Sequence, residues 1–219
     1  MTLRPRRLLL LLAGGVIVFV AEQAIQTIRI LDAVEQDRDR WQRPQAVIEA
    51  LDLHTGQHVV DLGAGAGYFT LKIAPLVGPD GEVLAVDLRR QSLAFLWIRA
   101  QLRGWRNVRP IVGAESDPRL PGDPVGSVLI VNTYHELSSP EAILSSLFAL
   151  MRPGGRLVIA DRAPRRPGRL EIRADHEIAA DAVVRAVERL GFHLELRNDA
   201  LVDISGDEDV WWLLAFGKP

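Results

Sequence analysis

A glycine-rich segment at residues 59–70 holds the residues of this chain that are best suited to bind a ligand. It reads Val-Val-Asp-Leu-Gly-Ala-Gly-Ala-Gly-Tyr-Phe-Thr, so two β-branched residues lead into Asp61 and three glycines then alternate with alanines. This order is typical of a buried strand that ends in a tight turn. Because glycine has no Cβ atom and reaches positive φ angles, a nucleoside can lie against the backbone of such a turn. The free N–H groups of a following helix would face the same ligand.

The spacing of the three glycines separates two classes of ligand. The dinucleotide-binding pattern G-x-G-x-x-G would place its third glycine at position 68, but that residue is Tyr68 and the glycine is Gly67. Together with Asp61, two residues before Gly63, the segment instead resembles motif I of the class I methyltransferases that depend on S-adenosylmethionine (SAM). A glycine-rich turn from another kind of nucleotide-binding fold is the alternative.

Further segments follow in the order that this family has. The apolar run 83–86 ends in Asp87, where the family has a carboxylate that binds the ribose hydroxyls. Alternatively, Asp87 caps the helix that follows. A third apolar run, 108–112, precedes Ala114 and Glu115, where family members hold the adenine. The resemblance implies that SAM is the cofactor and that it is bound by Asp61, Gly63, Ala64, Gly65, Gly67, Tyr68, Asp87, Leu88, Ala114, Glu115 and Asn132.

The catalytic candidates follow the fourth apolar run, 128–131, at the edge where open α/β sheets bind ligands. Asn132 would contact the methionine end of SAM. His135, with an ordinary pKa of about 6.5, is suited to accept a proton from a hydroxyl group of the acceptor; a structural hydrogen bond to the loop backbone is its alternative role. Tyr134 is expected to form a wall of the pocket. Family members that methylate amino groups of nucleic-acid bases have prolines here, and residues 132–135 have none.

Composition limits the other possibilities. The chain has 219 residues and is 48% hydrophobic, which is enough for one globular domain with a full core. Its net charge of −2 gives it no overall basic character, so we expect no nucleic-acid partner. The absence of cysteine excludes disulfides, thiolate metal sites and a cysteine nucleophile. The five histidines show no metal-ligand spacing, so we expect no metal.

Strand-like and helix-like patterns alternate along residues 44–190, and two alternating segments, 193–201 and 210–216, follow. This order predicts an α/β fold with a doubly wound, mostly parallel sheet and a C-terminal antiparallel hairpin. The resemblance implies seven strands in the Rossmann-like arrangement of class I methyltransferases. Trp41 precedes the first helix of this region, and we expect it either to shield the cofactor or to pack that helix onto the sheet.

The N-terminal residues require a separate prediction. Arginines at positions 4, 6 and 7 precede an apolar run at 8–21, which is shorter than the roughly 20 residues that cross a bilayer comfortably. No clean signal-peptidase site follows it. We predict a hydrophobic helix that acts as a signal anchor or transmembrane segment at 1–21, a linker helix at 22–40 and a methyltransferase domain at 41–219. The protein would then be anchored to a membrane, on a side that the sequence leaves open.

The sequence therefore favours a SAM-dependent methyltransferase that acts on a small-molecule or lipid-like acceptor. An arginine-rich stretch at 162–173 is either a solvated loop or a binding site for an acidic substrate or for lipid phosphate headgroups. Two other functions stay open. One is a nicotinamide-dependent oxidoreductase with a Rossmann fold, and the other is a SAM-binding module without catalytic activity.

Overall fold

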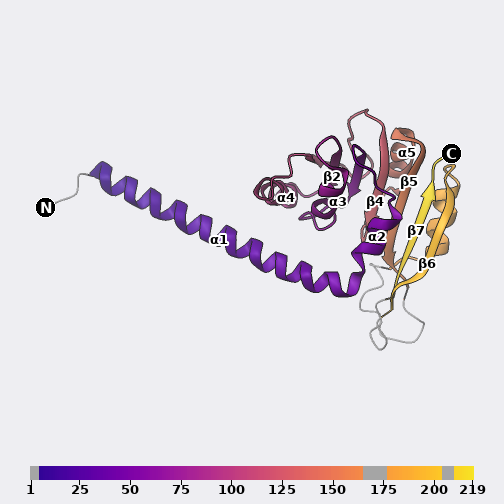
Figure 1. Ribbon diagram of the computed structural model, residues 1–219, viewed down its shortest axis with the longest axis horizontal. Helices are drawn as coiled ribbons and strands as arrows, with labels where there is room; N and C mark the ends of the chain where they lie inside the picture. The colour runs from indigo at the N-terminus through magenta and orange to yellow at the C-terminus, as the bar shows by residue number, and fades with distance from the viewer. Residues whose placement is uncertain (1–4, 165–176, 204–209) are drawn as a thin grey trace. The chain divides into compact units, whose positions relative to one another are not determined.

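Figure 1 shows the computed structural model of the protein, which describes residues 5–164, 177–203 and 210–219. The chain divides into two units, Met1–Arg40 and Trp41–Pro219, and each has its own structure. The second unit spans the residues that we predict to form the methyltransferase domain.

The N-terminal unit is helical. Helix α1 runs without a break over Pro5–Gln42, so it has no boundary near residue 21. The charged segment 37–40, expected to be a solvated linker, belongs to this helix, and Arg40 Nη1 lies 3.6 Å from Asp37 Oδ1. Within the described ranges, no helix combines the length and the apolar character needed to cross a membrane. The prediction of a transmembrane segment at 1–21 is therefore not supported.

The second unit contains a seven-stranded sheet with the order β3-β2-β1-β4-β5-β7-β6. Neighbouring strands among β1 to β5 pair in parallel, whereas β7 is antiparallel to both β5 and β6. This confirms the predicted doubly wound fold with a C-terminal antiparallel hairpin. The strands are β1 His58–Leu62, β2 Glu82–Asp87, β3 Val108–Val112, β4 Val125–Val131, β5 Met151–Arg162, β6 His193–Asp203 and β7 Val210–Gly217.

Helices cover both faces of the sheet, which explains why the central strands are apolar without alternation. On one face, α2 (Pro44–Ala50), α3 (Thr70–Val77) and α4 (Arg90–Leu102) share a core with the strands. On the other face, α5 (Pro140–Leu150) and α6 (Ala180–Glu188) build a second core. The strand order changes direction between β1 and β4, so the carboxyl ends of these two strands flank the crevice where such sheets bind ligands.

Local details differ from the sequence-based expectations at several points. The amphipathic pattern at 175–190 predicts a helix, and the structure has α6 at Ala180–Glu188; residues 175 and 176 lie outside the described ranges. Residues 138–141, Ser-Ser-Pro-Glu, resemble a capping box, but Ser139 occupies the N-cap of α5 without a side-chain hydrogen bond. Trp41 packs against Trp211 of β7, with ring centroids 6.2 Å apart, which fits the packing role.

The central strand β4 provides a test of this core. Leu129 is fully buried there, so we expect Leu129→Ala to lower the free energy of unfolding by about 2–5 kcal/mol through lost contacts and a cavity. Leu196→Ala is the matched control, since Leu196 lies on the edge strand β6 and is 45% exposed, and we expect it to change stability by less than about 1 kcal/mol. Chemical denaturation measures both, and equal losses would contradict the described core.

Candidate active site

The glycine-rich turn joins β1 to α3 and is fixed to the neighbouring strand β2. The amides of Gly63 and Ala64 both donate to the Val86 carbonyl, at 2.8 and 3.0 Å. All three glycines have positive φ angles, 82° at Gly63, 53° at Gly65 and 95° at Gly67. The predicted glycine turn is therefore present at the carboxyl end of the central strands.

The three glycines of this turn have different surroundings. A Cβ atom at Gly63 would overlap the Thr133 side chain, and one at Gly67 would lie 2.8 Å from Leu96 Cγ. These two glycines allow close packing within the protein. At Gly65, a Cβ atom would meet nothing within 4 Å, so this glycine faces open space. An open, glycine-lined turn at the end of a strand fits a nucleoside ligand such as the adenosyl part of SAM.

Asp61 has a structural role next to the glycine-rich turn. Its side chain is buried and accepts a hydrogen bond of 2.5 Å from the hydroxyl of Thr70, in the first turn of α3. This bond joins the end of β1 to the start of α3 and so fixes the ends of the intervening glycine turn. Tyr68 is also buried and packs edge-on against Phe69, with ring centroids 4.8 Å apart.

Asp87 lies at the end of β2, beside the glycine turn. Its Oδ2 accepts the Gly65 amide at 2.9 Å and its Oδ1 accepts the Arg89 amide at 2.8 Å. The N-cap of α4 is Arg89 rather than Asp87, so the alternative capping role does not apply. Because a carboxylate offers about four lone-pair sites, acceptor capacity remains for the two hydroxyls of a ribose. Leu88 follows with 57% of its surface exposed.

The residues expected at the adenine follow β3 in a short turn. The Gly113 amide donates to the Asp87 carbonyl at 3.1 Å, which places this turn next to the end of β2. Ala114 and Asp117 then form an isolated antiparallel bridge around Glu115, which is exposed. The structure thus brings the ends of β1, β2 and β3 together, as the resemblance implies.

Asn132 directly follows β4 and has a strained conformation. Its φ angle is 51°, which is uncommon for a residue other than glycine, and its amide donates to the Ala160 carbonyl of β5 at 2.9 Å. Thr133, the residue whose side chain lies against Gly63, follows and bonds the Val131 carbonyl at 3.0 Å. The loop after β4 therefore lies directly beside the glycine turn.

A buried histidine–aspartate pair follows in the 3₁₀ helix η1 (Tyr134–Glu136). His135 Nδ1 lies 2.8 Å from Asp161 Oδ1, and the His135 amide donates to Asp161 Oδ2 at 3.2 Å. The two side chains are 3% and 0% exposed. The hydrogen bond to Asp161 raises the pKa of His135 above its ordinary value of 6.5, although burial acts in the opposite direction.

Sequence reasoning missed Asp161, although the signal was present. Asp161 is near the end of β5, and the strand order makes β5 the neighbour of β4, so the two carboxyl ends meet at one edge. A carboxylate in an otherwise apolar strand, as at 157–161, indicates a buried partner. Tyr134 also proved more buried than a pocket wall would be, and burial raises the pKa of its phenol.

Arg99 is a second residue that the sequence reasoning missed. It lies on α4 with no exposed surface, and its Nη1 donates to the Ala66 carbonyl at 2.6 Å. Ala66 stands between Gly65 and Gly67, so this guanidinium supports the turn from the protein side. The signal was its position on the same helical face as the buried residues Leu93 and Leu96.

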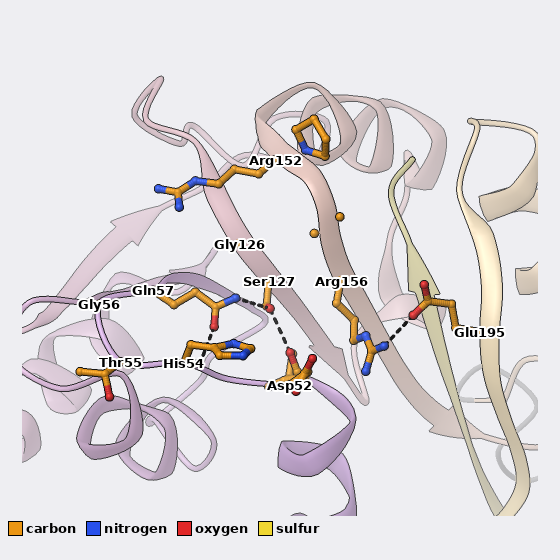
Figure 2. Close-up of a pocket in the computed structure, with 14 residues that line it drawn as sticks. Asp52, His54, Thr55, Gly56, Gln57, Gly126, Ser127, Arg152, Arg156 and Glu195 are labelled. Carbon is orange, nitrogen blue, oxygen red and sulfur yellow. Dashed lines mark hydrogen bonds and ion pairs between the residues drawn. The ribbon is translucent and has the colours of Figure 1, made fainter.

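One cavity lies away from the residues that the sequence predicts to form the site. A polar cavity of about 360 Å³ lies at the opposite edge of the sheet, between the segment before β1 and the first residues of β4 and β5, and no predicted site residue lines it (Figure 2). Its polar groups bond one another: Gln57 donates to Ser127 at 2.8 Å, and Arg156 pairs with Glu195 at 2.7 Å.

Of the arginine-rich stretch, residues 165–173 are outside the described ranges, and Arg162 lies over the Trp211 ring. No group of metal-binding side chains occurs in the described part of the chain.

Comparison with known proteins decides between the ligand classes. Residues 53–208 match the model of a family described as "Methyltransferase domain". The chain belongs to the class I SAM-dependent methyltransferases.

Individual relatives of this methyltransferase differ in their named reactions. The chain is 31% identical over 125 residues to the ubiquinone/menaquinone biosynthesis C-methyltransferase UbiE of Pasteurella multocida, covering 55% of this chain and 45% of that one. It is 34% identical over 154 residues to the ribosomal RNA small subunit methyltransferase G of Deinococcus deserti, covering 66% and 58%. The chain thus spans about half the length of the curated relatives it matches.

A solved structure supports the fold of this methyltransferase. The crystal structure of a SAM-dependent methyltransferase from Aquifex aeolicus superimposes with a TM-score of 0.67 over 79% of this chain and 88% of that one. The identity is 24%, so this likeness concerns the fold alone.

The open space at Gly65 yields a test of cofactor binding. We expect Gly65→Ala to weaken SAM binding by about tenfold or more, because the added methyl group would occupy the space left for the ligand. Gly56→Ala is the matched control, since Gly56 also has a positive φ angle of 83° and open space around it but lies before β1.

Isothermal titration calorimetry measures the affinities and thermal unfolding measures the strain in each variant. Both substitutions strain the backbone, so we expect similar losses of stability. Equal SAM affinity in the two variants would contradict the assignment of Gly65 to the cofactor site.

Proposed function

We propose that this protein transfers a methyl group from SAM to a small-molecule or lipid-like acceptor that loses a proton in the reaction, with His135 as the general base. The observation that carries this proposal is the buried pair of His135 and Asp161, whose Nδ1 and Oδ1 atoms lie 2.8 Å apart. A base is needed only where the acceptor arrives protonated, and a carboxylate-oriented histidine is suited to that role.

The residues that would hold SAM are those gathered at the carboxyl ends of β1, β2, β3 and β4. Asp87 would accept the ribose hydroxyls, the turn at Gly65 would lie against the adenosyl group, and Ala114 and Glu115 would border the adenine. Asn132 would contact the methionine end. When bound, SAM supplies a methyl group on a positively charged sulfur, which is a good leaving group.

The chain itself would orient the acceptor and remove its proton. With Asp161 ionised, Nδ1 of His135 carries the ring proton and donates it to Oδ1, which leaves Nε2 as the basic nitrogen. The same bond fixes the plane of the ring and stabilises the imidazolium that forms when Nε2 takes up a proton. Positioning of the acceptor against the methyl group would supply much of the remaining rate enhancement.

Two observations support the proposed acceptor class. The loop at 132–135 lacks the prolines expected for base-amino methylation, and one relative is named for quinone biosynthesis. These two observations favour a small or lipophilic acceptor. Another relative is a ribosomal RNA methyltransferase, so RNA is the second candidate acceptor.

Replacement of the base should affect turnover far more than cofactor binding. We expect His135→Gln to lower kcat by about 10²–10⁴-fold while the Kd for SAM stays within about threefold of the original value. His193→Gln is the control, because His193 also pairs with a carboxylate, Glu195 at 3.0 Å, but is exposed on β6. Full activity in His135→Gln would exclude the general-base role.

The pH dependence of the activity should reflect the pairing of His135 with Asp161. Because Asp161 raises the pKa of His135, the base form is lost as the pH falls through a value above 6.5, and activity should fall with it. We expect Asp161→Asn to lower this midpoint as well as kcat, because the charge that stabilises the imidazolium is gone. A pH profile of kcat, measured for the unaltered protein and for Asp161→Asn, tests this expectation. An unchanged midpoint would contradict the effect of Asp161 on the pKa of His135.

The acceptor class is tested with methyl-labelled SAM. The purified protein is incubated with a lipid extract, with a reduced quinone and with ribosomal RNA, and transfer is counted in each fraction. We expect label in the lipid-soluble fractions, and label only in RNA would favour the second candidate.

Calorimetry with SAM and NADH accompanies this assay and distinguishes the remaining functions. SAM binding without any transfer would indicate a binding module. NADH binding in place of SAM binding would indicate an oxidoreductase. We expect Asp87→Ala to weaken SAM binding in the same experiment.

A further inference from the structure

The region that includes α4 is strongly basic, although the whole chain has a net charge of −2. Between Asp87 and Glu115 the sequence contains no acidic residue and six arginines, at positions 89, 90, 99, 103, 106 and 109. Only Arg99 is buried. In the described part of the chain, no carboxylate pairs with Arg90, Arg106 or Arg109, whereas Arg89 lies 3.6 Å from Asp87. Positive charge therefore concentrates in segment 89–109, which contains α4 and the start of β3.

The same region exposes large apolar side chains. Trp97 is 50% exposed, Ile98 43% and Leu102 69%, and Leu88 just before α4 is 57% exposed. These four residues, which we call the α4 apolar face, are four of the six large hydrophobic residues that are exposed in the described part of the second unit; the others are Leu76 and Leu196. Isolated exposed apolar residues are common, but a group on one helix marks an interaction surface.

Helical geometry places these side chains together. Positions 98 and 102 are one turn apart, and position 97 is about 100° around the helix from 98, so the three side chains lie within one half of the surface of α4. The opposite side carries the buried residues Leu93, Leu96, Arg99 and Ala100, which face the sheet and the glycine turn. The helix contacts β2 and the edge strand β3, and Figure 1 shows it at the end of the second unit that is far from β6 and β7. Its outer side is directed away from the core.

We propose that the α4 apolar face is a peripheral binding surface for membranes that contain anionic lipids. Tryptophan and aliphatic side chains beside arginines are the composition of helices that lie in the plane of a lipid interface. The arginines complement the negative lipid headgroups, and the long apolar side chains enter the acyl boundary. A nucleic acid would match the charge but would leave Ile98, Leu102 and Leu88 without an apolar environment. The chemistry thus favours a lipid surface over RNA.

This surface adjoins the cofactor site. Leu88 directly follows Asp87, whose carboxylate bonds the Gly65 amide of the glycine turn. A membrane bound at the α4 apolar face would therefore lie next to the site proposed for SAM. The proposal concerns binding alone and stands whether or not the acceptor is a lipid.

Vesicle co-sedimentation of the full chain tests this surface. One set of vesicles contains phosphatidylcholine alone, and the other adds phosphatidylserine. We expect tighter binding to the anionic vesicles, and a loss of about tenfold or more in the double variant Trp97→Ser/Leu102→Ser, because two inserted apolar side chains are removed. Leu196→Ser is the matched control, since it removes an exposed apolar residue from β6, and we expect it to bind as the unaltered chain does.

The N-terminal unit is the same in every variant, so any vesicle binding by α1 is a constant background. The proposal is overturned if the double variant binds anionic vesicles as tightly as the control, or if the two vesicle types bind equally. It is also overturned if size-exclusion chromatography shows that the double variant loses self-association, or if ribosomal RNA binds at the face and the anionic vesicles do not. Unchanged thermal unfolding in the double variant shows that the fold is intact, and brominated lipids that quench Trp97 would place this residue in the bilayer.

Discussion

The backbone amides of the glycine-rich turn are held by the end of strand β2, and the site depends on this attachment. Gly63 and Ala64 donate to the Val86 carbonyl, and Gly65 donates to the Asp87 carboxylate. Three consecutive amides are thus fixed by two neighbouring residues of one strand. Arg99 supports the same turn through the Ala66 carbonyl, and Leu96 packs at Gly67. The turn is pre-organised by the fold, so little ordering should be needed when a nucleoside binds.

The sequence allowed the fold to be predicted because its signals are local. Buried parallel strands are short apolar runs, and β1, β2 and β3 each end close to the expected residue. Boundaries were less certain where long-range contacts decide them: β4 begins at Val125, three residues before the expected start. The uninterrupted helix α1 also follows from local propensity, since residues 22–40 contain no proline or glycine to end it.

The site was predictable only where its residues belong to one continuous motif. Asp61 and the glycines lie within a few residues of one another, whereas His135 and Asp161 are 26 positions apart and meet because β4 and β5 are paired. Arg99 was missed for a related reason: its helix also carries exposed apolar residues, so the apolar pattern alone did not show which side faces the core. Contacts between elements require the strand order before they can be inferred.

The buried Asp161 has a consequence for how this sequence can diverge. Its carboxylate has no exposed surface and is bonded by the imidazole and amide of His135 and by the amide of Arg162. Replacement of His135 by a side chain that cannot donate a hydrogen bond would leave a buried negative charge without its main partner, which is strongly destabilising. Mutations at positions 135 and 161 are therefore coupled, and lineages that abandon the histidine should replace the aspartate as well.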